Sequence, residues 1–432
     1  MLDKQLLEQV LADQLRSFLS EESLAERDVS IIPHLTTPEI TVITGVRRCG
    51  KSTLMKLVAR QIQNEFSIFY IDLDDSRLFD FTLQNFQDAL EIWLKWRQKK
   101  ENRIVFFFDE IQNIAGWERW VTALAKNANY KVCITGSNAT LLSSDLATHL
   151  TGRYTTIALM PFSFPEAVRL SNRSDMSSIV WRKSTEGRVA LRRRLEEYLQ
   201  FGGFPRAILS RSTHVLPQYY KDILEKDIIH HHDVRNRKGI TALGRLLMSD
   251  VTKLFNKSSA AHEIGIERPA TIGNYCSYFE ECYLVSEVKG FSYSVRKQSR
   301  SLPKYYAVDV ALARSVSFGF SANDGVALEQ LVFLELLRRE KEIFYWRSVD
   351  GFEVDFVTSR GKGIDEAIQV SLALSIPKTR ERELRALEVV QRELNVKKLT
   401  LITLDESEPE IALGKGSVRV VSFADWALAP WE

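Results

Sequence analysis

The chain has 432 residues, which is enough for two to four domains of about 100 to 200 residues each. Hydrophobic residues make up 45% of it and charged residues 26%, so a disordered or fibrous protein is excluded. The 58 Lys and Arg residues almost balance the 56 Asp and Glu residues, giving a formal net charge of +2. This balance excludes a protein that coats nucleic acid by its overall charge, and any basic surface must be local.

Residues 1–26 place leucine and valine at steps of three and four, which predicts an amphipathic N-terminal helix. From Glu39, short runs of β-branched and aromatic residues alternate with helical patterns. Runs without polar alternation are typical of strands that are buried on both faces of a parallel sheet. We therefore expect an α/β nucleotide-binding core. Its predicted strands are ITVITG, SIFYIDL, RIVFFFDE, YKVCITGS and YTTIAL.

The pattern after Pro165 is helical and basic, and arginines are concentrated between Arg182 and Arg194. A solvated helix face is the ordinary explanation for them, and a nucleic-acid channel is the alternative. Further on, a short helix, a turn near Gly265 and a second helix that opens at Arg268 precede two strand-like segments around a basic loop. This order of helix, turn, helix and hairpin predicts a winged helix. The last third returns to an α/β pattern.

The cysteines and histidines predict neither a metal site nor a disulfide framework. The run His230 to His232 points in directions about 100° apart on a helix, so these side chains cannot share one ion, and a solvated helix end explains them. No segment approaches 18 uncharged apolar residues, so we expect a cytoplasmic protein that does not enter a membrane. The four cysteines, which suit a reducing compartment, are Cys49, Cys133, Cys276 and Cys282.

The strongest motif is GVRRCGKS, a GxxxxGKS phosphate loop between a predicted strand and a predicted helix. Two glycines let the backbone wrap closely around phosphate, and the N–H groups with the helix N-terminus bind the anion. Lys51 would reach the β and γ phosphates, and Ser52 would offer a hydroxyl to Mg²⁺, so ATP and Mg²⁺ are the predicted ligands. The predicted binding residues are Gly45, Val46, Arg47, Arg48, Cys49, Gly50, Lys51, Ser52 and Thr53.

A nucleoside triphosphatase also needs a carboxylate for the metal and a group that orients water. Asp109 and Glu110 end the strand RIVFFFDE and predict these two roles in that order. Ser137 and Asn138 end the next strand, where a polar side chain can contact the γ phosphate or the water. Arg153 is a candidate arginine finger, and a solvated or paired arginine is the alternative.

The motifs GVRRCGKST, FFFDEIQ, ITGSNATLL, LTGRY, PFSFPE and GGFPRA occur in an order that resembles the AAA+-like ATPases with a C-terminal restriction-endonuclease-like domain. The resemblance spans residues 30–400. It implies ATP binding by Lys51 and Ser52, metal and water roles for Asp109 and Glu110, and a sensor role near Ser137, but it implies no substrate. The segments predicted on this basis are an N-terminal amphipathic helix (1–30), a P-loop AAA+-like ATPase core (31–172), a helical lid region (173–239), a winged-helix domain (240–308) and an endonuclease-like α/β domain (309–432).

The endonuclease-like fold usually combines a helix acid, a strand Asp and an E-x-K or Q-x-K sequence on the next strand. Position 371 is Ser rather than Lys, so the charge-stabilising group is missing from its expected place. Cleavage of DNA and a retained fold that serves binding or assembly therefore remain alternatives, the second being favoured. The candidate residues are Glu329 or Glu335 on the helix, Asp355, Gln369, and Lys378 as a substitute lysine.

The basic loop FSYSVRKQSRSLPK suits contacts to the DNA backbone that carry no sequence choice. A structural module that contacts protein is the alternative. The possible DNA-binding residues are Arg268, Arg296, Lys297, Arg300 and Lys304.

Three functions follow from these elements. The first is an ATPase that couples its nucleotide cycle to DNA binding or remodelling, the second is a nucleotide-dependent switch or scaffold for protein partners, and the third is an ATP-gated nuclease. The first is preferred because DNA is the simplest partner common to all the predicted domains. An arginine finger is often supplied by a neighbouring subunit, so a homo-oligomer is expected.

Overall fold

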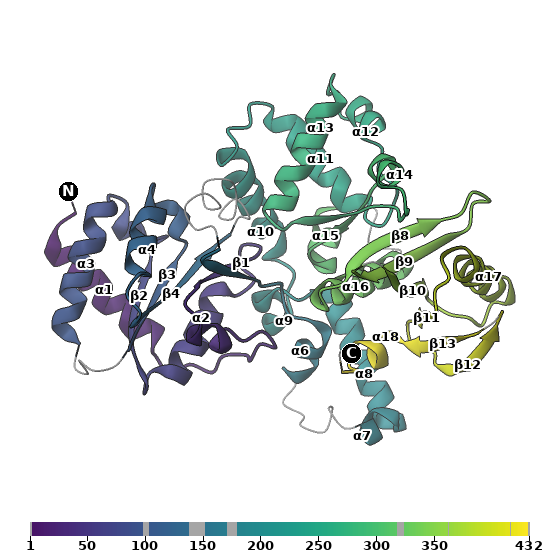
Figure 1. The fold of residues 1–432 in the computed structure, drawn as a ribbon, viewed down its shortest axis with the longest axis horizontal. Coiled ribbons are helices and arrows are strands. Elements are labelled where there is room, and N and C mark those ends of the chain that lie inside the picture. Colours follow the sequence, from purple (N-terminus) through teal and green to yellow (C-terminus); the bar gives the residue numbers. More distant parts are fainter. Residues whose placement is uncertain are drawn as a thin grey trace. The chain divides into compact units, whose positions relative to one another are not determined.

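The computed structural model describes residues 2–97, 103–137, 152–170, 179–317, 324–361, 363–414 and 416–430. The chain divides into two compact units, residues 1–160 with 281–283, and residues 161–280 with 284–432 (Figure 1). The division after Met160 lies ahead of residue 172, where we predict that the core ends. The reason is that the segment from Phe162 packs within the second unit, where the Tyr198 hydroxyl donates to the Phe162 carbonyl at 2.6 Å.

The first unit is built on a five-stranded parallel sheet with the strand order β2-β3-β4-β1-β5. Strands β1, β3 and β4 are buried along nearly their whole length, which explains why their sequences carry no polar alternation. The elements of this unit are α1 (Lys4–Phe18), η1 (Ile32–Thr36), β1 (Ile40–Thr44), α2 (Lys51–Ile62), β2 (Phe66–Asp72), η2 (Ser76–Leu78), α3 (Leu83–Trp96), β3 (Arg103–Asp109), η3 (Ile111–Asn113), α4 (Trp117–Leu124), β4 (Tyr130–Gly136) and β5 (Tyr154–Ala158).

Aromatic side chains hold the helix α3 against the sheet. Phe69 of β2 meets Trp93 edge to face at a ring distance of 5.6 Å, and Phe86 meets Phe108 in the same way at 5.8 Å. All four side chains are buried. Burial of each such side chain contributes roughly 1.5–3 kcal/mol, so this cluster is a major source of stability for the unit.

The N-terminal helix α1 begins after Asp3, whose carboxylate accepts a hydrogen bond from the Gln5 N–H. It packs on β2 and α3 through its apolar face. The helix ends at Phe18, earlier than the pattern over residues 1–26 predicts. The Arg60 guanidinium, on α2, donates to the carbonyl oxygens of Ser20 and Glu22. These carbonyl groups are therefore bonded to a side chain, and the chain after Phe18 is not helical.

The second unit begins with helices and a two-stranded antiparallel sheet, β6-β7. Helix α10 runs directly into a π-helical stretch, η6. No helix among those that the structure describes has the length and apolar character needed to cross a membrane. The elements of this part are α6 (Phe164–Arg169), α7 (Ile179–Lys183), α8 (Thr185–Phe201), α9 (Pro205–Ser210), α10 (Leu216–Asp222), η6 (Ile223–His230), α11 (Arg237–Ser249), α12 (Lys257–Glu263), α13 (Pro269–Glu281), β6 (Val285–Val288), α14 (Val295–Arg300), β7 (Lys304–Ala307) and α15 (Val310–Val316).

A six-stranded mixed sheet follows in the same unit, with the order β12-β13-β11-β10-β9-β8. Strands β10, β11 and β13 are parallel, whereas β8, β9 and β12 pair antiparallel with their neighbours. Helix α17 packs on β9 and β10. The elements are α16 (Asp324–Arg338), β8 (Glu342–Arg347), β9 (Glu353–Arg360), β10 (Gly363–Ser371), α17 (Pro377–Leu394), β11 (Lys398–Thr403), β12 (Glu408–Leu413), β13 (Gly416–Ser422) and α18 (Phe423–Ala427).

The segment between β6 and β7 differs from the simple basic loop that the sequence predicts. Part of it forms the short helix α14, which begins when the Ser294 hydroxyl accepts from the Lys297 N–H. Arg296, Lys297 and Arg300 are exposed on α14, and their predicted contact with DNA stays a prediction. The placement of Lys304 on that loop is wrong, because Lys304 is the first residue of β7 and its side chain is buried among carboxylates.

The three consecutive histidines differ in their surroundings. His230 and His231 are exposed, whereas the ring of His232 stacks on Tyr278 at a centroid distance of 3.8 Å. Burial, with a smaller contribution from His231, lowers the pKa of His232 to about 4. An unfolded histidine titrates near pH 6.5, so the unfolded chain binds more protons than the folded chain between these two pH values.

We therefore predict that the free energy of unfolding decreases as the pH falls from 6.5 toward 4, because protonation of His232 favours the unfolded chain. The substitution His232→Gln removes the titrating group, so the drop in melting temperature between pH 7.5 and 5 should become smaller than in the wild type. His230→Gln, at an exposed position, is the matched control and should leave the drop unchanged. Equal pH slopes for all three proteins would contradict the prediction.

Candidate nucleotide-binding site

The phosphate loop lies between β1 and α2 at the C-terminal end of β1. Gly45 has φ = 140° and Gly50 has φ = 107°, conformations that side chains rarely allow. A Cβ atom on Gly45 would also stand 2.1 Å from the Leu159 carbonyl oxygen. Glycine is therefore required at the start of the loop, and the loop leads directly into the N-terminus of a 12-residue helix. This geometry suits an anion.

Lys51 is held across the loop that precedes it. Its side chain is only 4% exposed, and its Nζ donates to the carbonyl oxygens of Gly45 at 3.0 Å and Val46 at 3.4 Å. The same Nζ lies 3.8 Å from Glu110 Oε1. The ammonium group thus lies between the carbonyl groups of the loop and the carboxylate of Glu110, the residue that follows β3.

Asp109 ends β3 and is almost completely buried. The Tyr70 hydroxyl donates to Asp109 Oδ2 at 3.2 Å, the Thr135 hydroxyl donates to Oδ1, and Ser52 also hydrogen-bonds to this carboxyl group. Burial, followed by the charge of Glu110, raises the pKa of Asp109. A cation in front of it would favour the ionised form again. Hydroxyl and carboxylate oxygens such as those of Ser52 and Asp109 are the ligands that Mg²⁺ prefers, so these residues fit the ion.

Glu110 directly follows β3, and its backbone adopts a left-handed conformation with φ = 52°. Its N–H donates to Thr135 Oγ1 at 2.9 Å, and Gln112 Nε2 donates to its Oε2 at 2.5 Å. Burial alone would raise the pKa of Glu110, but Lys51 and Arg47, with smaller contributions from hydrogen bonds, lower it overall. Two adjacent acids therefore have pKa values shifted in opposite directions, as expected for groups with different roles.

Strand β4 lies between β3 and β1 and brings Ser137 to the same edge of the sheet. Ser137 is buried and hydrogen-bonds to Glu110. Its neighbour in the predicted sensor position, Asn138, lies outside the described residues. Thr135 was missed by the sequence analysis, although the TGS ending of this strand contains it.

Arg153 does not join this site within one chain. It directly precedes β5, and its carbonyl oxygen accepts from the N–H of Ile40 at the start of β1, at 2.8 Å. The phosphate loop follows the opposite end of β1, so Arg153 stands at the other edge of the sheet. A finger role in its own site is therefore excluded by this placement, and a role in the site of a second copy stays a prediction.

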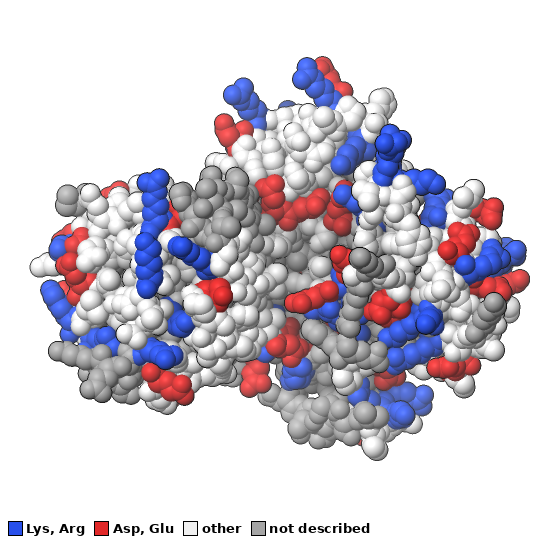
Figure 2. Space-filling view, viewed as in Figure 1, with Lys and Arg blue, Asp and Glu red and all other residues white. Residues whose placement is uncertain are grey.

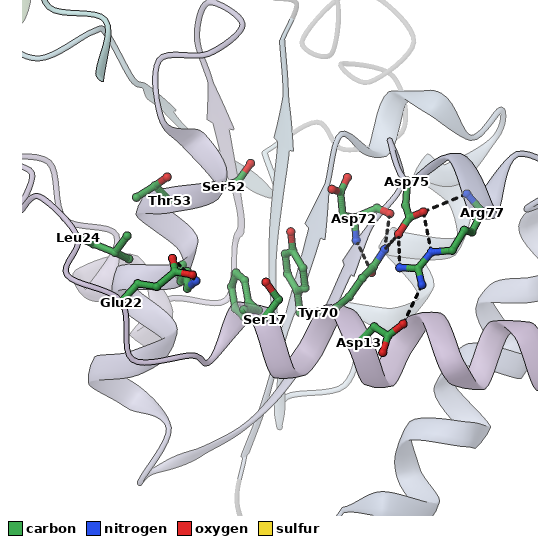
Figure 3. A pocket seen from close by; sticks show the side chains of 13 residues that line it. Asp13, Ser17, Glu22, Leu24, Ser52, Thr53, Tyr70, Asp72, Asp75 and Arg77 are labelled. Atoms are coloured by element: carbon green, nitrogen blue, oxygen red, sulfur yellow. Dashed lines mark hydrogen bonds and ion pairs between the residues drawn. The ribbon is translucent and has the colours of Figure 1, made fainter. Parts of the chain in front are cut away.

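A cavity of about 470 Å³ lies beside Ser52 and Thr53, between α1, α2 and the end of β2 (Figure 3). Asp72 lines it, and burial together with the charge of Asp109 raises the pKa of Asp72 to about 6. The register pairs Asp72 directly with Asp109, so both strands end in an acid at the same level. This neighbour was also missed, although Asp72 is the second-last residue of SIFYIDL.

The acids predicted in the C-terminal part separate into two groups. Asp355 and Gln369 are neighbours, since Gln369 Oε1 accepts from the Asp355 N–H at 3.4 Å, and Glu329 lies near Asp355. Glu335 does not join them: its Oε1 pairs with Arg339 at 3.3 Å on another face of α16. Six helical positions separate Glu329 from Glu335, which turns them about 120° apart. Lys378 is exposed and lies outside the buried cluster.

A parallel sheet with a phosphate loop after β1 and an Asp-Glu pair at the end of β3 defines a P-loop nucleoside-triphosphatase-like core. Residues 37–168 match a family model described as an AAA domain. Residues 192–324 and 324–424 match two domains of unknown function, DUF8612 and DUF4143. The part of the chain that contains the phosphate loop and the two acids is therefore similar to AAA domains.

The whole chain has relatives of similar length. It is 32% identical over 456 residues to the uncharacterized protein MJ1544 of Methanocaldococcus jannaschii, covering 99% of this chain and 96% of that protein, and it belongs to the same family. An uncharacterized protein of Haemophilus influenzae is 28% identical over 426 residues, covering 96% and 99% of the two chains. Among solved structures, the Walker-type ATPase PABY2304 of Pyrococcus abyssi matches with a TM-score of 0.40 and 16% identity, covering 73% of this chain and 96% of that one.

We predict that Thr135 is the main support of the two acids. Thr135→Val keeps the shape but removes the donor to Asp109 and the acceptor for the Glu110 N–H, so the free energy of unfolding should fall by about 1–3 kcal/mol. Urea denaturation measures this value. Thr156→Val, at an exposed position on β5, is the control and should change it by less than about 0.5 kcal/mol. A similar effect of both substitutions would contradict the assignment.

Proposed function

We propose that this protein binds and hydrolyses ATP with Mg²⁺ and couples the cycle to the binding or remodelling of DNA. The observation that carries the ATPase part is the convergence of Lys51, Ser52, Asp109 and Glu110 around one phosphate loop. These residues come from the C-terminal ends of β1 and β3, with β4 between them, and combine cation, hydroxyl and carboxylate groups within one site. Phosphoryl transfer to water needs this combination.

In this mechanism the loop N–H groups and the α2 N-terminus bind the phosphates, and Lys51 exchanges its contacts with the loop carbonyls for the β and γ phosphates. Ser52 and Asp109, which hydrogen-bond to each other, would hold Mg²⁺, and the ion would supply positive charge that neutralises the phosphate oxygens. Glu110 orients a water molecule and accepts its proton while the oxygen attacks the γ phosphorus, and ADP leaves as the bridging bond breaks.

Ser137 holds Glu110 and is the sensor that we propose, together with Asn138. Arg153 is assigned to the site of a second copy, because it stands at the edge of its own sheet opposite the phosphate loop. A positive side chain there would stabilise charge that develops on the transferred phosphoryl group. The enzyme would then be active as a homo-oligomer.

The DNA part is supported by the region from α11 to β7. Three helices precede an antiparallel strand pair, the arrangement from which we predict a winged helix. Arg296, Lys297 and Arg300 are exposed on α14 beside Tyr293, which is 69% exposed, and Arg268 is exposed just before α13. Figure 2 shows basic side chains over the region where Figure 1 labels α14. Cations with an exposed aromatic ring suit phosphates and bases.

We predict that Lys51→Ala abolishes ATP binding, whereas Glu110→Gln keeps binding and lowers the hydrolysis rate by about 10²–10⁴-fold, because only the water-activating group is lost. Binding of a fluorescent ATP analogue and release of phosphate measure the two steps separately. Glu65→Gln, at an exposed position, is the matched control and should behave like the wild type. Unchanged hydrolysis in Glu110→Gln would overturn the role of this residue, and no hydrolysis in the wild type would overturn the ATPase proposal.

The DNA part is tested by substituting Arg296, Lys297 and Arg300 together with alanine. We expect one DNA form among single-stranded, duplex and branched DNA to stimulate hydrolysis several-fold, and the triple variant to lose this stimulation with its basal rate unchanged. The logarithm of the affinity for duplex DNA falls linearly with the logarithm of the salt concentration. Loss of three phosphate contacts should make this slope shallower by about 2–3.

The matched control removes equal charge from exposed positions of the first unit, Lys95, Arg119 and Lys126. It should keep the stimulation. If no DNA form changes the rate and none binds, the DNA proposal fails, and the alternative is a nucleotide-dependent switch or scaffold that acts on protein partners.

A further inference from the structure

The second unit contains a buried charge cluster that the ATPase mechanism does not use. Lys304, at the start of β7, has a side chain that is 4% exposed, and its Nζ lies 2.7 Å from Glu353 Oε1 and 3.5 Å from Glu329 Oε1. Glu329 belongs to α16, and Glu353 begins β9. A third acid, Asp355 of β9, acts on Lys304 electrostatically. One ammonium group therefore faces carboxyl groups from two separate elements.

Other groups of the chain donate hydrogen bonds to two of the three acids around this lysine. The Tyr306 hydroxyl donates to Glu329 Oε1 at 2.7 Å, and the N–H of Val370 donates to Asp355 Oδ2 at 2.8 Å. Gln369, expected to be part of a metal-binding triplet, instead donates from Nε2 to Glu383 Oε2 at 2.8 Å. Among the residues that the structure describes, no group of three or more His, Cys, Asp or Glu side chains is arranged to hold a metal ion.

The surrounding acids favour the ionised form of Lys304. Burial alone would lower the pKa of Lys304, but Glu329, Asp355 and Glu353 outweigh it and raise the pKa overall. Burial, followed by the charge of Glu329, raises the pKa of Asp355 well above its usual range. The cluster thus favours the protonated, positively charged form of Lys304 and disfavours the ionised form of Asp355.

We propose that the ammonium group of Lys304 is the resident cation of this acid cluster, so that the cluster excludes divalent metal ions and joins β7 to α16 and β9 instead of cleaving DNA. In this proposal Lys304 does not take over the catalytic role of the lysine that an endonuclease-like site would carry at position 371. A buried ammonium occupies the space in front of Glu329 and Glu353 that a metal ion would need, and a metal ion would have to displace it.

The test is a titration of the full chain, without nucleotide, with Mn²⁺ followed by electron paramagnetic resonance. The wild type and Asp355→Asn should bind the same number of ions, because the cluster is closed. Lys304→Met should gain one further site per chain, and Lys304→Met/Asp355→Asn should lose it again. The phosphate-loop site is unchanged in all four proteins, so the differences report the cluster alone.

The proposal is overturned if the wild type binds a Mn²⁺ ion that Asp355→Asn does not bind, or nicks plasmid DNA with Mn²⁺ or Mg²⁺ in a way that this substitution abolishes. It is also overturned if Lys304→Met gains no site. None of these outcomes depends on ATP hydrolysis, so they are distinguishable from a failure of the proposed function.

A second variant covers the case in which Lys304→Met does not fold. Lys304→Ala leaves room for a small amine, so propylammonium chloride should raise its melting temperature by several degrees more than equal sodium chloride does. Lys297→Ala, at an exposed position on α14, is the matched control and should show no such difference. Equal responses of the two variants would contradict a resident cation at Lys304.

Discussion

The parallel pairing of β1, β3 and β4 is the constraint on which the nucleotide site depends. Parallel strands in register end at the same edge, so the phosphate loop after β1, the Asp-Glu pair after β3 and Ser137 after β4 meet although 92 residues of sequence separate Gly45 from Ser137. The same register places Arg153 at the opposite edge. One geometric rule therefore decides both which residues form the site and which candidate lies away from it.

A buried acid at such an edge is stable only if polar neighbours hold it, because an unpaired carboxyl group without water is costly. Tyr70 and Thr135 from the two flanking strands do this for Asp109. Tyr70 in turn stacks on Phe18 at 3.8 Å, which connects the N-terminal helix to the same network. The helix α1 is therefore part of the support of the site and not an independent arm.

The strands and the phosphate loop could be predicted because their signals are local: uninterrupted apolar runs, and glycines at fixed spacing. The supporting residues could not, since a threonine inside a strand or an aspartate at the end of one has no distinctive local pattern. The end of α1 was missed for a related reason. Its apolar spacing continues past Phe18, and the Arg60 contacts that end the helix come from a different part of the chain.

Lys304 shows the limit of motif spacing most clearly. A search along β10 for the lysine of an endonuclease-like site ends at Ser371, and a search further on reaches only the exposed Lys378. The lysine that meets these acids comes instead from a hairpin before the sheet, separated by 49 positions from Glu353. Spacing rules assume that chemistry and chain order go together. A buried ion pair requires only that opposite charges lie close together, so any element that packs against the acids can supply the cation. Here Lys304 of β7 supplies it, at the position that a metal ion would need under our proposal.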